Sequence, residues 1–116
     1  MKEKREITRQ RKRIKVRFSI DGARKFGFTD DLSENGFFIR SPQVERPKSL
    51  IQVELELPGE EPIVLEAEVR WAKRIPLQMV QRGKKGGMGV QIQRFISGEK
   101  SYRGLLVQQE DKVPAG

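Results

Sequence analysis

The chain has 116 residues, enough for one domain with a single hydrophobic core but not for two. It contains no cysteine and no histidine, which excludes disulfide bonds, thiolate metal sites, cysteine nucleophiles and the commonest general base. Residues 1–17 contribute seven of the net +8 charges, with nine Lys or Arg against two Glu, so the rest of the chain is close to neutral.

The N-terminal segment is therefore the most unusual part of the chain. Residues 1–8 are dense in Lys, Arg and Glu and lack apolar periodicity, so we expect a mobile basic arm. This asymmetry of charge predicts an anionic partner that the arm contacts. No apolar run approaches the roughly 20 residues of a membrane span, and the charged N-terminus does not resemble a signal peptide. We therefore expect a cytoplasmic protein.

Three short strands are predicted after the arm. Residues 14–19 alternate apolar and polar side chains, which indicates a half-buried strand. Asp21-Gly22 is a hairpin signal, and the return strand over residues 25–29 is expected to point its two Phe side chains to one face. A third strand follows over residues 37–41, and the prolines after it predict a loop.

Three further strands are predicted in the second half of the chain. Residues 51–57 alternate strictly, and Pro58-Gly59-Glu60-Glu61-Pro62 closes a hairpin into the strand of residues 63–71. Residues 75–86 are expected to form a flexible connection, and residues 88–92 a sixth strand. Six short strands separated by turn signals predict an all-β protein, a six-stranded antiparallel barrel without exposed edges.

The period of the apolar residues changes after Phe95, which predicts a short C-terminal α-helix packed on the barrel. Ser97 can cap this helix and Glu99 falls in its first turn, whereas Pro114 stops it. The residues on helical spacing are Tyr102, Leu105, Leu106 and Gln109.

The turn Asp31-Leu32-Ser33-Glu34-Asn35-Gly36 between the second and third strands combines residues that favour turns for different reasons. Asp31 and Ser33 can bond nearby backbone amides, Asn35 tolerates left-handed angles, and Gly36 adopts positive φ without steric cost. The same turn presents a carboxylate, a hydroxyl and bare backbone to a ligand.

The turn and the basic segment before it together resemble a known family. Arg9-xxx-Arg13, an alternating strand, and then Asp31-x-Ser33-x-x-Gly36 resemble the RxxxR and [D/N]xSxxG elements of the PilZ domain. The resemblance continues at Glu68-Val69-Arg70-Trp71 and at Gly87-Met88-Gly89-Val90, and it spans roughly residues 5–95. Arg5-xxx-Arg9 also fits the first element. We prefer Arg9 and Arg13 because Arg13 directly precedes the strand.

The resemblance implies a PilZ-type β-barrel that binds cyclic di-GMP and has no output domain of its own. It divides the chain into the basic arm (1–8), the barrel domain (9–96), and the C-terminal helix and tail (97–116). Its implied partners are cyclic di-GMP and an unidentified downstream protein, with no cofactor and no metal. The implied ligand-binding residues are Arg9, Arg13, Asp31, Ser33 and Gly36, with additional contacts from Arg5, Thr8 and Gln10.

The chemistry of these residues agrees with that ligand. Arginine can bond guanine O6 and N7, or two phosphate oxygens, in bidentate fashion. The carboxylate of Asp31 suits the N1/N2 donor edge of guanine, and Ser33 can donate to a phosphate or accept from the base. Gly36 would let the ligand approach the strand without meeting a Cβ. Asp30 and Asp31 should point to opposite sides of an extended backbone, so only Asp31 is expected to face the ligand.

Two alternatives come from other functional classes. The first is a small basic β-barrel that binds RNA or single-stranded DNA. Against it, the positive charge is confined to the arm, and Trp71 and the Phe residues alternate inward as core, leaving no outward aromatic pair for stacking. The second is a ligand-free PilZ-like module for protein contacts. An enzyme is the least favoured interpretation, since no catalytic constellation is evident.

Overall fold

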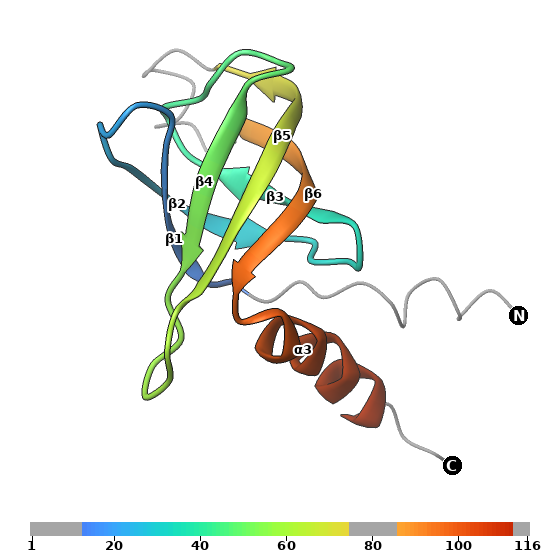
Figure 1. Ribbon diagram of the computed structural model, residues 1–116. Coiled ribbons are helices and arrows are strands. Elements are labelled where there is room, and N and C mark those ends of the chain that lie inside the picture. The colour runs from blue at the N-terminus through green and yellow to red at the C-terminus, as the bar shows by residue number, and fades with distance from the viewer. Residues whose placement is uncertain (1–12, 75–85, 113–116) are drawn as a thin grey trace, which may run out of the picture.

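Within the residues that the structure describes, the chain forms a closed six-stranded barrel followed by the helix α3 (Figure 1). The computed structural model describes residues 13–74 and 86–112, with residues 107–112 described through the backbone alone. All strand pairs are antiparallel, and neighbours follow the order β1-β2-β3-β6-β5-β4. The prediction of an all-β antiparallel barrel with a C-terminal helix is confirmed. The elements are β1 (Lys15–Ser19), β2 (Lys25–Asp30), β3 (Gly36–Arg40), β4 (Leu50–Leu55), β5 (Ile63–Lys73), β6 (Gly87–Ser97) and α3 (Glu99–Lys112).

The core forms where strands alternate apolar and polar side chains, as a barrel with one buried face requires. In β1, β4 and the first part of β5, every second residue is buried, as the sequence pattern predicted. β4 ends at Leu55 rather than Leu57, and β6 continues to Ser97, well beyond the predicted strand. The buried apolar residues of these strands are Val16, Phe18, Ile51, Val53, Leu55, Ile63, Leu65, Ala67 and Val69.

The prediction that the Phe residues alternate inward is wrong for β2. Phe26 is 50% exposed and Phe28 is 40% exposed, whereas Gly27 and Thr29 face the core. The reason is the pairing register, in which Val16 of β1 lies opposite Gly27. Residues directly opposite each other share a face, so the inward Val16 places Gly27 inward and the phenylalanines outward. A Cβ at Gly27 would lie 2.5 Å from the carbonyl oxygen of Arg40, so only glycine fits there.

Trp71 is likewise predicted to be buried but lies on the surface, where it is 51% exposed. The pairing of β5 with β6 shifts register between Val69 and Trp71, and such a bulge reverses the alternation of the residues beyond it. The indole stacks on Phe38 with a centroid separation of 5.3 Å. It also lies over the backbone of β6, since a Cβ at Gly89 would meet Trp71 Nε1 at 2.4 Å.

The helix α3 packs across the lower end of the barrel (Figure 1). Gly98, with φ +86°, turns the chain out of β6, and its carbonyl accepts the amide of Tyr102 at 3.0 Å. Tyr102 is only 1% exposed and its ring packs against Phe95 and Phe37, with centroid separations of 5.4 and 6.2 Å. Among the described residues, no helix is both long and apolar enough to cross a membrane.

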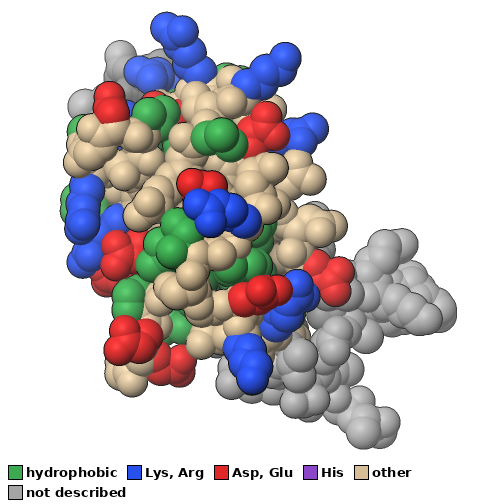
Figure 2. All heavy atoms as spheres, in the orientation of Figure 1, with side chains coloured by type: hydrophobic (Ala, Val, Ile, Leu, Met, Phe, Trp, Pro, Cys, Tyr) green, Lys and Arg blue, Asp and Glu red, His purple; other side chains and the backbone are tan. Residues whose placement is uncertain are grey.

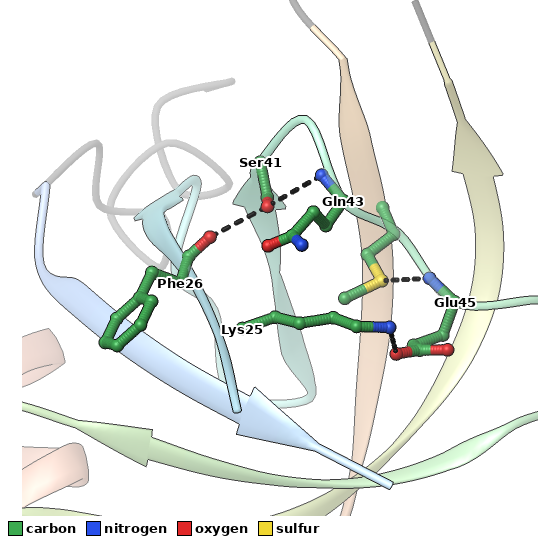
Figure 3. Close-up of polar contacts among 6 residues, drawn as sticks. Lys25, Phe26, Ser41, Gln43 and Glu45 are labelled. Atoms are coloured by element: carbon green, nitrogen blue, oxygen red, sulfur yellow. Dashed lines mark hydrogen bonds and ion pairs between the residues drawn. The ribbon is translucent and has the colours of Figure 1, made fainter. Parts of the chain in front are cut away.

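The opposite end of the barrel is fixed by side-chain hydrogen bonds from the connection between β3 and β4 (Figure 3). The hydroxyl of Ser41 donates to the carbonyl of Phe26 at 2.8 Å and accepts the amide of Gln43 at 3.1 Å. Lys25 Nζ donates to Glu45 Oε2 at 2.5 Å. These bonds fix the end of the barrel away from the turn of residues 31–36.

Charged side chains of both signs are interspersed on the face shown in Figure 2. Arg17 of β1 pairs with Glu54 and Glu56, and Arg94 of β6 pairs with Glu66. This arrangement agrees with the near-neutral charge that the sequence assigns to the chain after residue 17.

Candidate functional site

The turn of residues 31–36 is closed by hydrogen bonds within the turn itself. The backbone amide of Ser33 donates to the carbonyl of Gly36 at 2.9 Å, and the Ser33 hydroxyl donates to the same oxygen at 3.1 Å. The hydroxyl proton is thus used by the turn, and the oxygen keeps lone pairs that can accept from a ligand. Ser33 is therefore both a structural residue and a candidate acceptor.

The expectation of left-handed backbone angles at Asn35 or Gly36 is wrong. The residue with left-handed backbone angles is Asp31, with φ 54°, rather than Asn35 or Gly36. Glycine is needed at position 36 for packing, since a Cβ there would lie 2.1 Å from the carbonyl oxygen of Val90. The third and sixth strands therefore approach too closely at this point for any other residue.

Arg13 reaches the outer face of β2 because the start of the barrel is tied to that strand. The amide of Ile14 donates to Thr29 Oγ1 at 2.9 Å, and the amide of Thr29 donates to the carbonyl of Ile14 at 2.8 Å. The Arg13 guanidinium lies 4.7 Å from the centroid of the Phe28 ring, within the range of a cation–π interaction. Arg13 thus stands beside the strand that leads into the turn.

A cavity of about 210 Å³ lies beneath Arg13. Its lining residues are Arg13, Thr29, Asp30 and Arg40. Asp30 Oδ2 accepts from Arg40 Nη2 at 2.7 Å, and Asp30 Oδ1 accepts the backbone amide of Asp31 at 3.1 Å. The cavity therefore contains two guanidinium groups and one carboxylate, directly before the first residue of the turn. Two planar cations that line one cavity suit an anionic or guanine-containing ligand.

The sequence analysis missed Asp30 and Arg40 as site residues. The argument against Asp30 assumed an extended backbone through Asp31, and the left-handed φ of Asp31 breaks that alternation. The alternation of β3 could have identified Arg40. Side chains two positions apart share a face, so Arg40 lies with Phe38 on the outer face of the strand that follows the turn.

Aromatic side chains line the same outer surface, and this overturns the expectation of no outward aromatic pair. Phe26 and Phe28 are exposed on β2, with Lys15 Nζ 6.0 Å from the Phe26 centroid. The stacked pair of Phe38 and Trp71 lies further around the barrel. The register of β2 with β3 places Phe38 opposite Asp30, so this pair borders the cavity residues.

A second, larger groove lies on the other side of β1, between the β4–β5 hairpin and α3. It is open to solvent, with a volume of about 970 Å³. Arg13 and Phe28 line it from the barrel, Leu57 and Pro58 from the hairpin, and Leu105 from the helix. Arg13 therefore contributes to both the small cavity and this groove.

Four of the predicted site residues lie in the described part of the chain. Asp31, Ser33 and Gly36 belong to the turn between β2 and β3, and Arg13 lines the small cavity with Asp30, the residue directly before that turn. The other predicted ligand contacts, and the predicted arm and connection, lie outside the described residues: Arg5, Thr8, Arg9, Gln10, residues 1–8 and residues 75–85.

Comparisons with known proteins agree with this fold. A family profile described as "PilZ domain" matches residues 3–108. No curated protein matches significantly. Among solved structures, the Bacillus subtilis inhibitor of motility (MotI/DgrA) superposes with a TM-score of 0.70 at 17% sequence identity. The match covers 92% of this chain and 52% of that one, so this chain spans about half the length of that protein.

Proposed function

Because the chain belongs to the PilZ domain family, we propose that it is a receptor for cyclic di-GMP. One observation carries the proposal: Arg13 lines a cavity with Asp30 and Arg40, immediately before the turn that begins at Asp31. Arg13, from the basic motif, thus shares a cavity with the residue that directly precedes the turn motif. The pair of motifs, and not either alone, supports a nucleotide site.

The arginines would bind the phosphates and the outer edges of the bases. Arg13 is exposed, and its guanidinium lies over the Phe28 ring. A cation–π contact uses none of the N–H donors of arginine, so these donors can bond a ligand. Arg40 is oriented by Asp30, which leaves the remaining guanidinium donors for the ligand. Arg9, directly after the arm, would supply a third planar cation. A ligand with two phosphodiester charges offers acceptors for all of them.

The turn would recognise the guanine base. The carboxylate of Asp31 can accept from guanine N1 and N2, which adenine does not offer as donors together. The Ser33 oxygen can accept one further hydrogen bond, because its own proton is held by Gly36. Replacing Asp31 by Ala should therefore reduce discrimination between guanine and adenine nucleotides.

The signal would arise from the N-terminal arm. A dianionic ligand at the turn would hold Arg9 and Arg13 in place and order the arm across the outer face. The resulting surface would be read by a downstream protein, so the chain would act as an adaptor rather than an enzyme. Hydrogen exchange of residues 5–17 and 30–37, with and without cyclic di-GMP, tests this mechanism.

A second candidate function is the binding of single-stranded nucleic acid, which the exposed aromatics favour. Phe26, Phe28 and Trp71 are each 40–51% exposed, and Lys15 and Arg13 lie over the Phe26 and Phe28 rings, so the surface combines aromatic and basic side chains as a stacking surface requires. Filter binding with homopolymeric RNA and DNA separates the two candidates. Tight, salt-dependent retention of homopolymer with no binding of cyclic di-GMP would favour the second candidate. Retention of neither ligand would favour a protein-interaction module that binds no nucleotide.

A further inference from the structure

Tyr102 connects α3 to the turn of residues 31–36 across the end of the barrel. Its hydroxyl lies 2.6 Å from the carbonyl oxygen of Ser33, to which it donates, and 3.4 Å from that of Gly36. These are the backbone carbonyls of two residues of the turn motif. Ser33 and Tyr102 are 69 positions apart in the sequence, so the contact joins elements that no local interaction would hold together.

The environment of Tyr102 keeps this hydrogen bond in place. The side chain is almost fully buried, and Phe37 and Phe95 pack against its ring. Burial raises the pKa of the phenol far above its ordinary value, so the group stays a neutral donor at all physiological pH values. A buried donor that lost its acceptor would carry an uncompensated desolvation cost, so turn and helix favour each other's position.

We propose that Tyr102 is a positioning residue that couples α3 to the ligand site, and that α3 is a second element that responds to the ligand. The inference rests on the proposed function. A ligand that favours the ordered turn would strengthen the attachment of α3 through the Ser33 carbonyl. By linkage, a partner that holds α3 against the barrel would tighten ligand binding by the same factor.

The larger groove, between the β4–β5 hairpin and α3, is the surface that this coupling would change. Ser101, Gly104 and Leu105 of α3 form one wall of the groove, and the β4–β5 hairpin forms another. A firmer attachment of Tyr102 would therefore fix one wall of the groove relative to the barrel. The turn and the groove wall lie on either side of Tyr102, and no rearrangement of the barrel core is needed to connect them.

The test compares the full-length protein with Tyr102→Phe and with Arg103→Ala as a matched control. Tyr102→Phe removes only the hydroxyl, whereas Arg103 is exposed on the same helix and bonds only Glu99 among the described residues. Without ligand, Tyr102→Phe should speed hydrogen exchange of the amides of residues 33–37 while leaving residues 50–55 unchanged. With cyclic di-GMP, its Kd should rise about threefold to tenfold, as expected for one lost hydrogen bond. Arg103→Ala should match the parent both in hydrogen exchange and in its Kd for cyclic di-GMP.

The parent protein supplies an independent readout. Saturating cyclic di-GMP should increase the protection of residues 99–106, and Tyr102→Phe should abolish that increase. Unchanged exchange at residues 33–37 in ligand-free Tyr102→Phe would overturn the coupling, whether or not the nucleotide binds. The coupling would also be overturned if the parent bound cyclic di-GMP with no change in the hydrogen-exchange protection of residues 99–106. Failure of the parent to bind at all would refute the proposed function instead, and the ligand-free comparison would still decide the coupling.

Discussion

Asp30 and Arg40 form an ion pair across two neighbouring strands, with Arg40 Nη2 2.7 Å from Asp30 Oδ2. The second oxygen of the same carboxylate accepts the amide of Asp31, so one side chain fixes both a guanidinium and the first residue of the turn. The pair is partly buried, and it lines the same cavity as Arg13. The pair therefore fixes the wall of the candidate ligand site next to the turn.

The first prediction follows from this pair. Arg40→Ala should weaken binding of cyclic di-GMP about tenfold, since charge-assisted hydrogen bonds contribute roughly 1.5–3 kcal/mol. Asp30→Ala should weaken it about threefold or more, because Arg40 loses its anchor. The effects should not add in the double variant, as expected for residues in contact. Calorimetric titration of the three variants measures this, with Arg94→Ala on β6 as a control. Simple additivity would mean that Asp30 does not act through Arg40.

The second prediction concerns the basic motif. Arg9→Ala and Arg13→Ala should each weaken cyclic di-GMP binding by at least about tenfold, for the same reason of lost charge-assisted bonds. Arg13 is exposed, so its removal should leave the melting temperature nearly unchanged. Arg5→Ala should have the smallest effect on affinity. If Arg5→Ala proved the most damaging of the three, the motif would begin at Arg5.

The third prediction separates packing from ligand binding at two glycines. Gly36→Ala places a Cβ against the backbone of Val90 and should cost at least about 2 kcal/mol of unfolding free energy. Gly104 lies within α3, and apart from the nearby backbone of that helix a Cβ there would meet no atom within 4 Å, so Gly104→Ala should stabilise the protein by about 0.5–1 kcal/mol. Urea denaturation checks both. A stable Gly36→Ala that has lost ligand binding would assign this glycine to the ligand rather than to the barrel.

The fourth prediction concerns alkaline pH. Burial raises the pKa of Tyr102, whereas in the unfolded chain the phenol ionises near about 10. The stabilisation from the neutral phenol is therefore complete below that pH and is lost as pH rises above it. The free energy of unfolding of the parent should fall by up to about 1.4 kcal/mol per pH unit relative to that of Tyr102→Phe. Tyr102 is the only tyrosine, so tyrosinate absorbance reports it directly. Ionisation near pH 10 in the folded protein would contradict this prediction.

Most of the fold could be predicted from the sequence because the period of each strand is local information. Val53 and Leu65 are buried as their alternation requires, and the hairpin glycines Gly22 and Gly59 have the positive φ expected of such turns. The exposure of Trp71 could not be predicted in this way. It depends on a register shift between two strands, which is a property of the pairing and leaves no mark on one strand's sequence.

In the candidate site, too, the residues within local motifs could be predicted, whereas those that depend on contacts between elements could not. The motif residues Arg13, Asp31 and Ser33 were identified from their spacing, and the structure places Arg13 at a cavity with Asp30, the residue before the turn of Asp31 and Ser33. Arg40 was missed because its role comes from its neighbour Asp30 on another strand. Tyr102 was recognised only as one of the residues on helical spacing, because its hydrogen bond to Ser33 depends on how the helix packs on the barrel.

The most direct test of the account is isothermal titration of the full-length protein with cyclic di-GMP, with cyclic di-AMP as the matched control. The two nucleotides carry the same phosphodiester charges, so a difference between them reports recognition of guanine by the turn. We predict saturable binding of cyclic di-GMP at one or two nucleotides per chain, lost in Arg13→Ala, and weak or no binding of cyclic di-AMP. Equal binding of both nucleotides, or binding of neither, would contradict the account.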